Sequence, residues 1–220
     1  MTRQLEFGRR AAASGKTGSM VVFLHGYGAD GADLLGLADP LAPHLPDTVF
    51  LAPDAPEPCA GNPFGRQWFP IPRLDGSTEA ATRAGLLAAA ADLDAFLDAR
   101  LAEEGLTPDR LALVGFSQGS MMALHVAPRR ALPVAGIVAF SGRLIGPERL
   151  AAETRSKPPV LLVHGDEDQM VDFGEMEAAG RALSGAGFAT YGHVMRGTGH
   201  GIAPDGLSAA LSFLHQHLSA

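Results

Sequence analysis

Ser117 lies between Gly115 and Gly119 in the stretch GFSQG. This is the G-x-S-x-G spacing, in which a sharp turn between a strand and a helix lifts a serine hydroxyl clear of the chain. Side chains two residues before and after the serine would collide in that turn, and glycine has none. Residues 110–114, RLALV, are typical of a strand, and residues 118–127 are typical of a helix. The context therefore predicts a nucleophilic serine rather than an ordinary serine in a glycine-rich turn.

A nucleophilic serine needs a general base, and the base needs a group that orients it. In chains with this serine motif, an acid and then a histidine follow the serine. Of the eight histidines, His200 alone lies in a glycine-rich loop after an expected strand late in the chain, and we predict that it is the base. Asp166 and Asp168 both follow a strand that ends at Val163 or His164, and their positions alone do not separate them.

Short apolar runs bounded by glycine and proline predict the strands that position these residues. Such runs are typical of strands buried on both faces, as in a parallel sheet. They span residues 20–24, 48–52, 110–116, 134–140 and 159–165, with a more exposed edge strand at 188–195. Helical patterns span residues 79–103, 118–127, 174–186 and 204–218. The alternation predicts an α/β fold with a mostly parallel central sheet, helices on both faces and sites at the carboxyl ends of the strands.

Composition excludes several classes of protein. A length of 220 residues is most economically a single domain, which we expect to span residues 1–220. The net charge of −7 argues against nucleic-acid binding, which needs a basic face. Residues 1–18 contain no apolar region typical of a signal peptide, and the apolar runs are too short to span a bilayer. These features predict a cytoplasmic protein without integral membrane association. Cys59 is the only cysteine, so an internal disulfide is excluded.

Motifs along nearly the whole chain resemble one known family. They are FLHGYGADG (23–31), LAPDAP (51–56), QWF (67–69), GFSQG (115–119), HGDEDQMV (164–171) and GHGI (199–202). Together they resemble the phospholipase/carboxylesterase family of α/β-hydrolases, which contains serine carboxylesterases and acyl-protein thioesterases. The resemblance implies the α/β-hydrolase fold. It selects Asp168, the last residue of H-G-x-x-D, as the acid and leaves Asp166 as a turn residue. It also implies that the oxyanion hole consists of the backbone N–H groups of Tyr27 and Gln118.

The resemblance implies cleavage of a small-molecule ester or acyl-chain substrate through an acyl-enzyme, without a metal or organic cofactor. Thioesterase and lysophospholipase activities are variants of the same chemistry. The pocket needs apolar walls, and Trp68 and Phe69 match the substrate-side aromatics of the family. Further candidates for the pocket are Phe64, Met170 and Val171. The apolar rim of such a pocket could serve substrate entry or a homodimer contact, which the sequence does not separate.

The segment 53–78 is rich in proline and glycine and shows no periodicity. Because a long irregular loop in a compact domain is usually functional, we expect it on the substrate side, where it could act as a partial lid.

Other functions of the same fold make different demands on these residues. A protein-depalmitoylating thioesterase would use the same triad. Dienelactone hydrolases carry cysteine where this chain has Ser117, and peptidases usually add a cap or propeller domain, for which this chain leaves little room. A catalytically silent binding protein generally loses the serine or the histidine, whereas Ser117 and His200 are both present.

Overall fold

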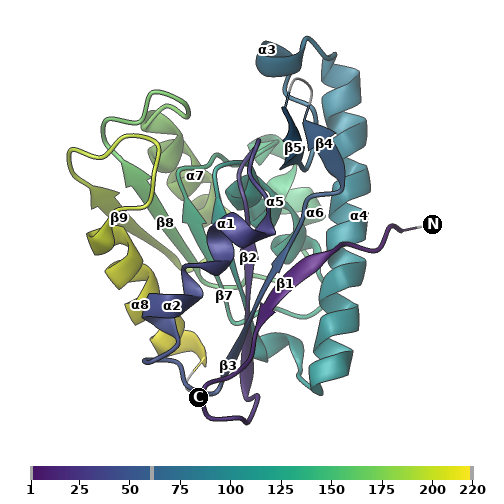
Figure 1. The fold of residues 1–220 in the computed structure, drawn as a ribbon. Helices are drawn as coiled ribbons and strands as arrows, with labels where there is room; N and C mark the ends of the chain where they lie inside the picture. The colour runs from purple at the N-terminus through teal and green to yellow at the C-terminus, as the bar shows by residue number, and fades with distance from the viewer. Residues whose placement is uncertain (1, 60–61, 219–220) are drawn as a thin grey trace.

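The computed structural model describes residues 2–59 and 62–218. Its centre is a seven-stranded sheet in the order β1-β3-β2-β6-β7-β8-β9 (Figure 1). The edge strand β1 is antiparallel to β3, and every other neighbouring pair is parallel. The strands are β1 (Phe7–Arg10), β2 (Ser19–Leu24), β3 (Thr48–Pro53), β6 (Leu111–Phe116), β7 (Gly136–Phe140), β8 (Val160–Gly165) and β9 (Thr190–Met195). The predicted α/β fold with a mostly parallel sheet is confirmed.

Helices cover both faces of the sheet (Figure 1). One face carries α1 (Gly31–Leu35), α2 (Ala38–Leu41) and α8 (Pro204–Leu218). The other carries α4 (Glu79–Glu104), α5 (Gln118–Val126), α6 (Pro147–Glu153) and α7 (Gly174–Gly185), with short 3-10 turns at Pro108–Arg110 and Ala127–Arg129. In the described part of the chain, no helix is both long and apolar enough to cross a membrane.

Alternate side chains of each central strand pack into the hydrophobic cores on opposite faces of the sheet. This explains why the strand sequences are continuous apolar runs. On β2, Val22 belongs to the core cluster that contains Leu93 of α4. The next residue, Phe23, belongs to the opposite cluster and stacks on Phe50 of β3, with ring centroids 5.9 Å apart.

The helix α4 follows the sequence signals closely. The Thr78 side chain accepts a hydrogen bond from the backbone N–H of Ala81, which satisfies a free donor of the first turn. Gly105 ends the helix in the left-handed conformation, with φ 67°. The leucines of its apolar stripe are buried: Leu86, Leu93, Leu97 and Leu101.

The segment 53–78 contains more regular structure than its sequence indicates. The strands β4 (Glu57–Cys59) and β5 (Asn62–Gln67) form a two-stranded antiparallel sheet, and α3 (Pro72–Asp75) follows. Prolines conceal the alternation that would reveal the strands. The strand β5 also bonds to the loop after β2, since Gly28 N donates to Arg66 O at 2.9 Å and Arg66 N donates to Ala29 O at 2.8 Å. The segment is therefore attached to the carboxyl end of the sheet.

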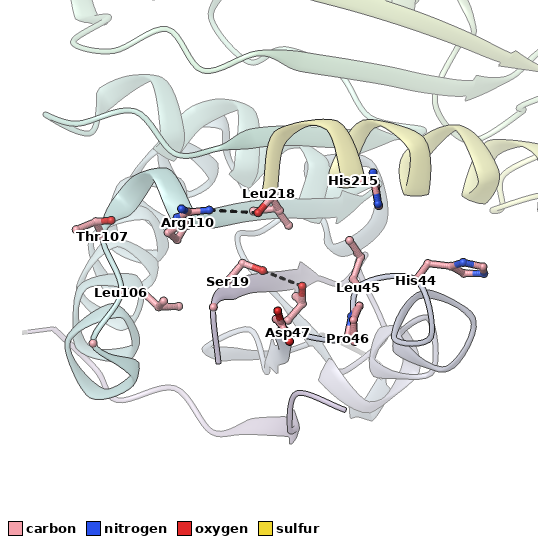
Figure 2. Close-up of a pocket in the computed structure, with 13 residues that line it drawn as sticks. Ser19, His44, Leu45, Pro46, Asp47, Leu106, Thr107, Arg110, His215 and Leu218 are labelled. Carbon is pink, nitrogen blue, oxygen red and sulfur yellow. Dashed lines mark hydrogen bonds between the residues drawn. The ribbon is translucent and has the colours of Figure 1, made fainter. Parts of the chain in front are cut away.

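A cavity of about 600 Å³ lies at the opposite end, beside the amino ends of β2 and β3 (Figure 2). Ser19 and Thr48 share a hydrogen bond of 2.8 Å between their hydroxyls there, and Arg110 Nη1 donates to Leu218 O at 3.3 Å. Because functional sites of parallel sheets lie at the carboxyl ends of strands, we do not assign chemistry to this cavity.

Candidate active site

Ser117 occupies the turn between β6, which ends at Phe116, and α5, which begins at Gln118. Its backbone has φ 53° and ψ −113°, a conformation that a residue with a side chain rarely adopts. Its N–H donates a 2.9 Å hydrogen bond to Phe140 O at the end of β7, which helps to hold the strained turn. Backbone strain of this kind is typical of functional sites.

The two glycines of the motif are required by separate contacts. A Cβ atom at Gly115 would lie within 3.0 Å of the Ser120 backbone nitrogen, inside the turn itself. A Cβ atom at Gly119 would overlap the carbonyl oxygen of Leu24 on β2. The Ser120 hydroxyl fills the remaining space and lies 2.7 Å from the carbonyl oxygens of Gly115 and Phe140. Each glycine therefore permits a close backbone approach that forms the turn.

His200 and Asp168 form a direct pair. His200 Nδ1 lies 2.7 Å from Asp168 Oδ2, and the aspartate side chain is fully buried. The other oxygen, Oδ1, accepts hydrogen bonds from the N–H groups of Met170 at 2.8 Å and Val171 at 3.0 Å. Burial raises the pKa of Asp168, but the bonds from His200, Val171 and Met170 outweigh burial and leave this pKa below its usual value. An ionised Asp168 keeps the proton on Nδ1, so Nε2 of His200 is available as a base.

Asp166, the other acid that the sequence left open, lies in a separate set of contacts. Its Oδ1 accepts a hydrogen bond of 2.7 Å from Gly197 N, and its Oδ2 accepts one of 3.1 Å from Arg196. The bond from Gly197 lowers the pKa of Asp166, with a further contribution from Arg196. Asp166 therefore fixes the turn that precedes His200.

The His200–Asp168 pair is placed beside the serine turn because the His200 ring packs on Phe116. The His200 ring lies against the ring of Phe116, the residue before Ser117, with centroids 4.8 Å apart. The loop after β2 also approaches the serine, since a Cβ atom at Gly26 would lie 3.3 Å from Ser117 Cβ. Tyr27 is the next residue of that loop. Gln118 is the first residue of α5, where backbone N–H groups have no partner within the helix.

His25 holds the loop that contains Tyr27, a role that the sequence did not reveal. Its Nε2 accepts a 2.9 Å hydrogen bond from Ala55 N, so its Nδ1 carries the proton and donates to Gly26 O at 2.8 Å. Burial lowers the pKa of His25, which keeps the ring neutral and this tautomer in place.

The Gln118 side chain connects the serine turn to the segment 67–69. Its Oε1 accepts a hydrogen bond from Trp68 N at 2.8 Å, and its Nε2 donates to Phe69 O at 2.7 Å. The Trp68 indole N–H donates to His25 O at 2.9 Å. Trp68 is fully buried, so it packs in the core and anchors the loop, and its expected place in the pocket wall is not observed.

A cavity of about 360 Å³ opens beside the serine turn. Three of the predicted pocket residues, Phe69, Met170 and Val171, line it, whereas Phe64 projects into solvent with 91% of its surface exposed. Met121 of α5 also lines the cavity and was missed. Its N–H donates to Ser117 O at 3.2 Å, one helical turn from the serine, and that spacing could have identified it.

The described residues contain no cluster of three histidine, cysteine, aspartate or glutamate side chains suited to a metal ion. A serine on a strained strand-to-helix turn, at the carboxyl end of a mostly parallel sheet, defines an α/β-hydrolase. The chain belongs to the phospholipase/carboxylesterase family, whose profile matches residues 11–218.

Named relatives share this family. The chain is 29% identical to the esterase YpfH of Escherichia coli K12 over 89% of this chain and 81% of that protein. It is 31% identical to a probable carboxylesterase of rice, Oryza sativa subsp. japonica, over 96% of this chain and 82% of that protein. Acyl-protein thioesterase 1 of Neurospora crassa is 28% identical, over 90% and 86%. The crystal structure of esterase PE8 superposes with a TM-score of 0.93 at 46% identity, covering 98% of this chain and all of that chain.

Proposed function

We propose that the protein is a serine carboxylesterase that cleaves esters of apolar acyl groups through Ser117, His200 and Asp168. The observation that carries this proposal is the 2.7 Å contact between His200 and the buried Asp168 beside the strained turn of Ser117. A strained serine alone is compatible with a structural turn. A histidine held by a buried, ionised carboxylate beside such a serine is the arrangement that activates a hydroxyl.

The proposed reaction has two steps. His200 Nε2 takes the proton from the Ser117 hydroxyl as the oxygen attacks the ester carbonyl, and the backbone N–H groups of Tyr27 and Gln118 stabilise the oxyanion. Asp168 keeps His200 Nδ1 protonated and stabilises the imidazolium. The imidazolium then protonates the leaving alcohol or thiol, and an activated water releases the acid from the acyl-enzyme.

The apolar residues that line the cavity beside the serine support the proposal of an apolar acyl group in the substrate. Phe69, Met121, Met170 and Val171 supply apolar wall, and methionine adapts to acyl chains of different shape. The segment 53–78 lies on the substrate side in this proposal, since Phe69 and its neighbours to Arg73 line the cavity. Arg73 Nη2 donates to Met170 O at 2.6 Å and so joins this segment to the loop of the acid.

Thioesters are a second candidate substrate class with the same residues. Several relatives are named acyl-protein thioesterase 1, at 26–29% identity. A thiol is a better leaving group than an alcohol, so the triad proposed here would need no further group to cleave a thioester.

The test is hydrolysis of a p-nitrophenyl ester series from acetate to palmitate by wild type, Ser117→Ala and the control Ser212→Ala. Ser212 is exposed on α8, far along the chain from the turn. We expect turnover by wild type and the control, and a loss of at least about a thousandfold in kcat for Ser117→Ala. Equal hydrolysis by wild type and Ser117→Ala, or inert wild type across the series, would contradict the proposal.

A further inference from the structure

A further cavity, of about 390 Å³, lies between α4, α5 and α6. These helices cover the same face of the sheet (Figure 1). We call this cavity the arginine cavity. It shares no lining residue with the cavity beside Ser117. Its lining residues are Arg83, Leu86, Leu87, His125, Arg129, Arg149 and Glu153.

The arginine cavity concentrates positive charge in a chain whose net charge is −7. Three guanidinium groups face a single carboxylate, that of Glu153. Arg129 pairs with this carboxylate, its Nε lying 2.9 Å from Glu153 Oε2, and its Nη1 donates to His125 O at 2.6 Å. The charge of Glu153 is thus already balanced by Arg129.

The two other arginines keep unused donors. Arg149 Nε is buried without a hydrogen-bond partner among the described residues, and its nearest carboxylate oxygens, on Glu153 and Glu148, are 3.7 and 3.9 Å away. Arg83 is exposed on α4 and takes part in none of the ion pairs formed within residues 2–59 and 62–218. An anion in the cavity would meet the guanidinium group of Arg83, which has no ion pair among the described residues. It would also meet that of Arg149, whose long contacts with Glu153 and Glu148 leave its Nε without a hydrogen bond.

His125 supplies a second, independent observation. It is 4% exposed, and its Nδ1 is buried without a hydrogen-bond partner in the described part of the chain. Buried polar side-chain atoms nearly always have a partner, so this nitrogen points to one that the protein does not provide. Burial lowers the pKa of His125 to about 4, and Arg129 and Arg149 lower it while Glu153 raises it. The neutral ring can donate one hydrogen bond to an oxyanion.

We propose that the arginine cavity binds a small organic oxyanion, a carboxylate or a phosphate monoester, that carries a short apolar tail. Arg83 and Arg149 bind the oxygens, because guanidinium groups match the geometry of carboxylates and phosphates. His125 donates a hydrogen bond to the same group. Leu86 and the half-exposed Leu87 provide the apolar wall for the tail.

Calorimetric titration of the full chain at low ionic strength tests the proposal with hexanoate, propyl phosphate and inorganic phosphate. The variants are Arg83→Gln and Arg149→Gln, and the matched control is Arg155→Gln, which removes an exposed arginine outside this cavity. We expect saturable binding of hexanoate or propyl phosphate to wild type and control, with Kd raised about tenfold in each variant. The tighter ligand identifies the oxyanion. Because Arg83 is exposed, its replacement leaves the fold intact.

Three outcomes would overturn the proposal. They are no saturable binding of either tailed ligand, equal affinity in Arg83→Gln and wild type, and, where propyl phosphate binds, equal affinity for inorganic phosphate. The His125 ring signals in NMR spectra provide a second readout, and we expect them to shift with the tailed ligand and to titrate at a higher pH. Ser117→Ala should bind as wild type does, so this result is independent of the proposed esterase activity.

Discussion

Replacing Gln118 with alanine tests how the serine turn is joined to the substrate-side segment. The side chain is fully buried and satisfies two buried backbone groups, the Trp68 N–H and the Phe69 carbonyl, at 2.8 and 2.7 Å. Alanine removes both partners, so both backbone groups lose their hydrogen bonds. Each buried polar group without a hydrogen-bond partner costs about 1–3 kcal/mol, so Gln118→Ala should lower the free energy of unfolding by about 2–6 kcal/mol.

Urea unfolding at 25 °C, followed by circular dichroism, measures this change. For a chain of this size, the central value of about 4 kcal/mol corresponds to a Tm lower by about 8–16 °C. The matched control is Gln216→Ala on the exposed side of α8, which we expect to change stability by less than about 0.5 kcal/mol. A loss below about 1 kcal/mol in Gln118→Ala would mean that the segment 67–69 does not depend on this side chain.

Three further predictions concern the turn, the acid and a buried histidine. Gly119→Ala should lower the free energy of unfolding by about 3 kcal/mol, the upper end of the usual cost of overpacking, because the new Cβ overlaps a backbone carbonyl of β2. Gly185→Ala, whose Cβ would meet no atom within 4 Å, is the control in urea unfolding. Asp168→Asn should lower kcat about 10⁴-fold in ester hydrolysis, since it no longer holds His200 in the right tautomer; unchanged kcat would exclude Asp168 as the acid. The pKa of His125 falls from 6.5 to about 4 on folding, so the unfolded chain binds the proton more readily. The free energy of unfolding should therefore fall by at most about 3 kcal/mol as the pH is lowered from above 6.5 towards 4. Urea unfolding of wild type and His125→Gln at both pH values should show a smaller fall in the variant.

The central strands could be predicted because each is buried on both faces. Residues 20–24 and 159–165, for example, correspond to β2 and β8, in which every residue is buried. The edge strand β1 could not be predicted, since it has four residues and two of them are arginines. The helices α1 and α2 are too short, at five and four residues, to show a helical period.

The parts of the candidate site that depend on the spacing of neighbouring residues could be predicted from the sequence. The serine turn is marked by glycines two positions before and after Ser117, and the loop of His200 carries its own glycines. The acid was not accessible from spacing, because Asp166 and Asp168 both follow β8 and are distinguished only by contacts in the folded chain. Asp166 accepts a bond from Gly197, whereas the buried Asp168 pairs with His200. Only the family resemblance chose between them.

Residues that act through distant contacts were missed for the same reason. His25 accepts a bond from a residue thirty positions away, and Gln118 bonds to the backbone of the segment 67–69 across about fifty positions. Trp68 was expected in the pocket because it lies in the segment 53–78 and matches the substrate-side aromatics of the family, but its indole N–H is paired with a buried carbonyl in the core. Residue type indicates what a side chain can contact, whereas the direction in which it points follows from the assembled sheet.

Labelling of the intact protein with a fluorophosphonate, followed by digestion and mass spectrometry, tests directly whether Ser117 is the nucleophile. A serine activated by His200 and Asp168 should attack the phosphorus, and we expect a single adduct, on Ser117, that forms much more slowly in Asp168→Asn. A folded wild-type protein that carries no adduct, or carries it on another serine, would contradict the assignment of Ser117 as the nucleophile.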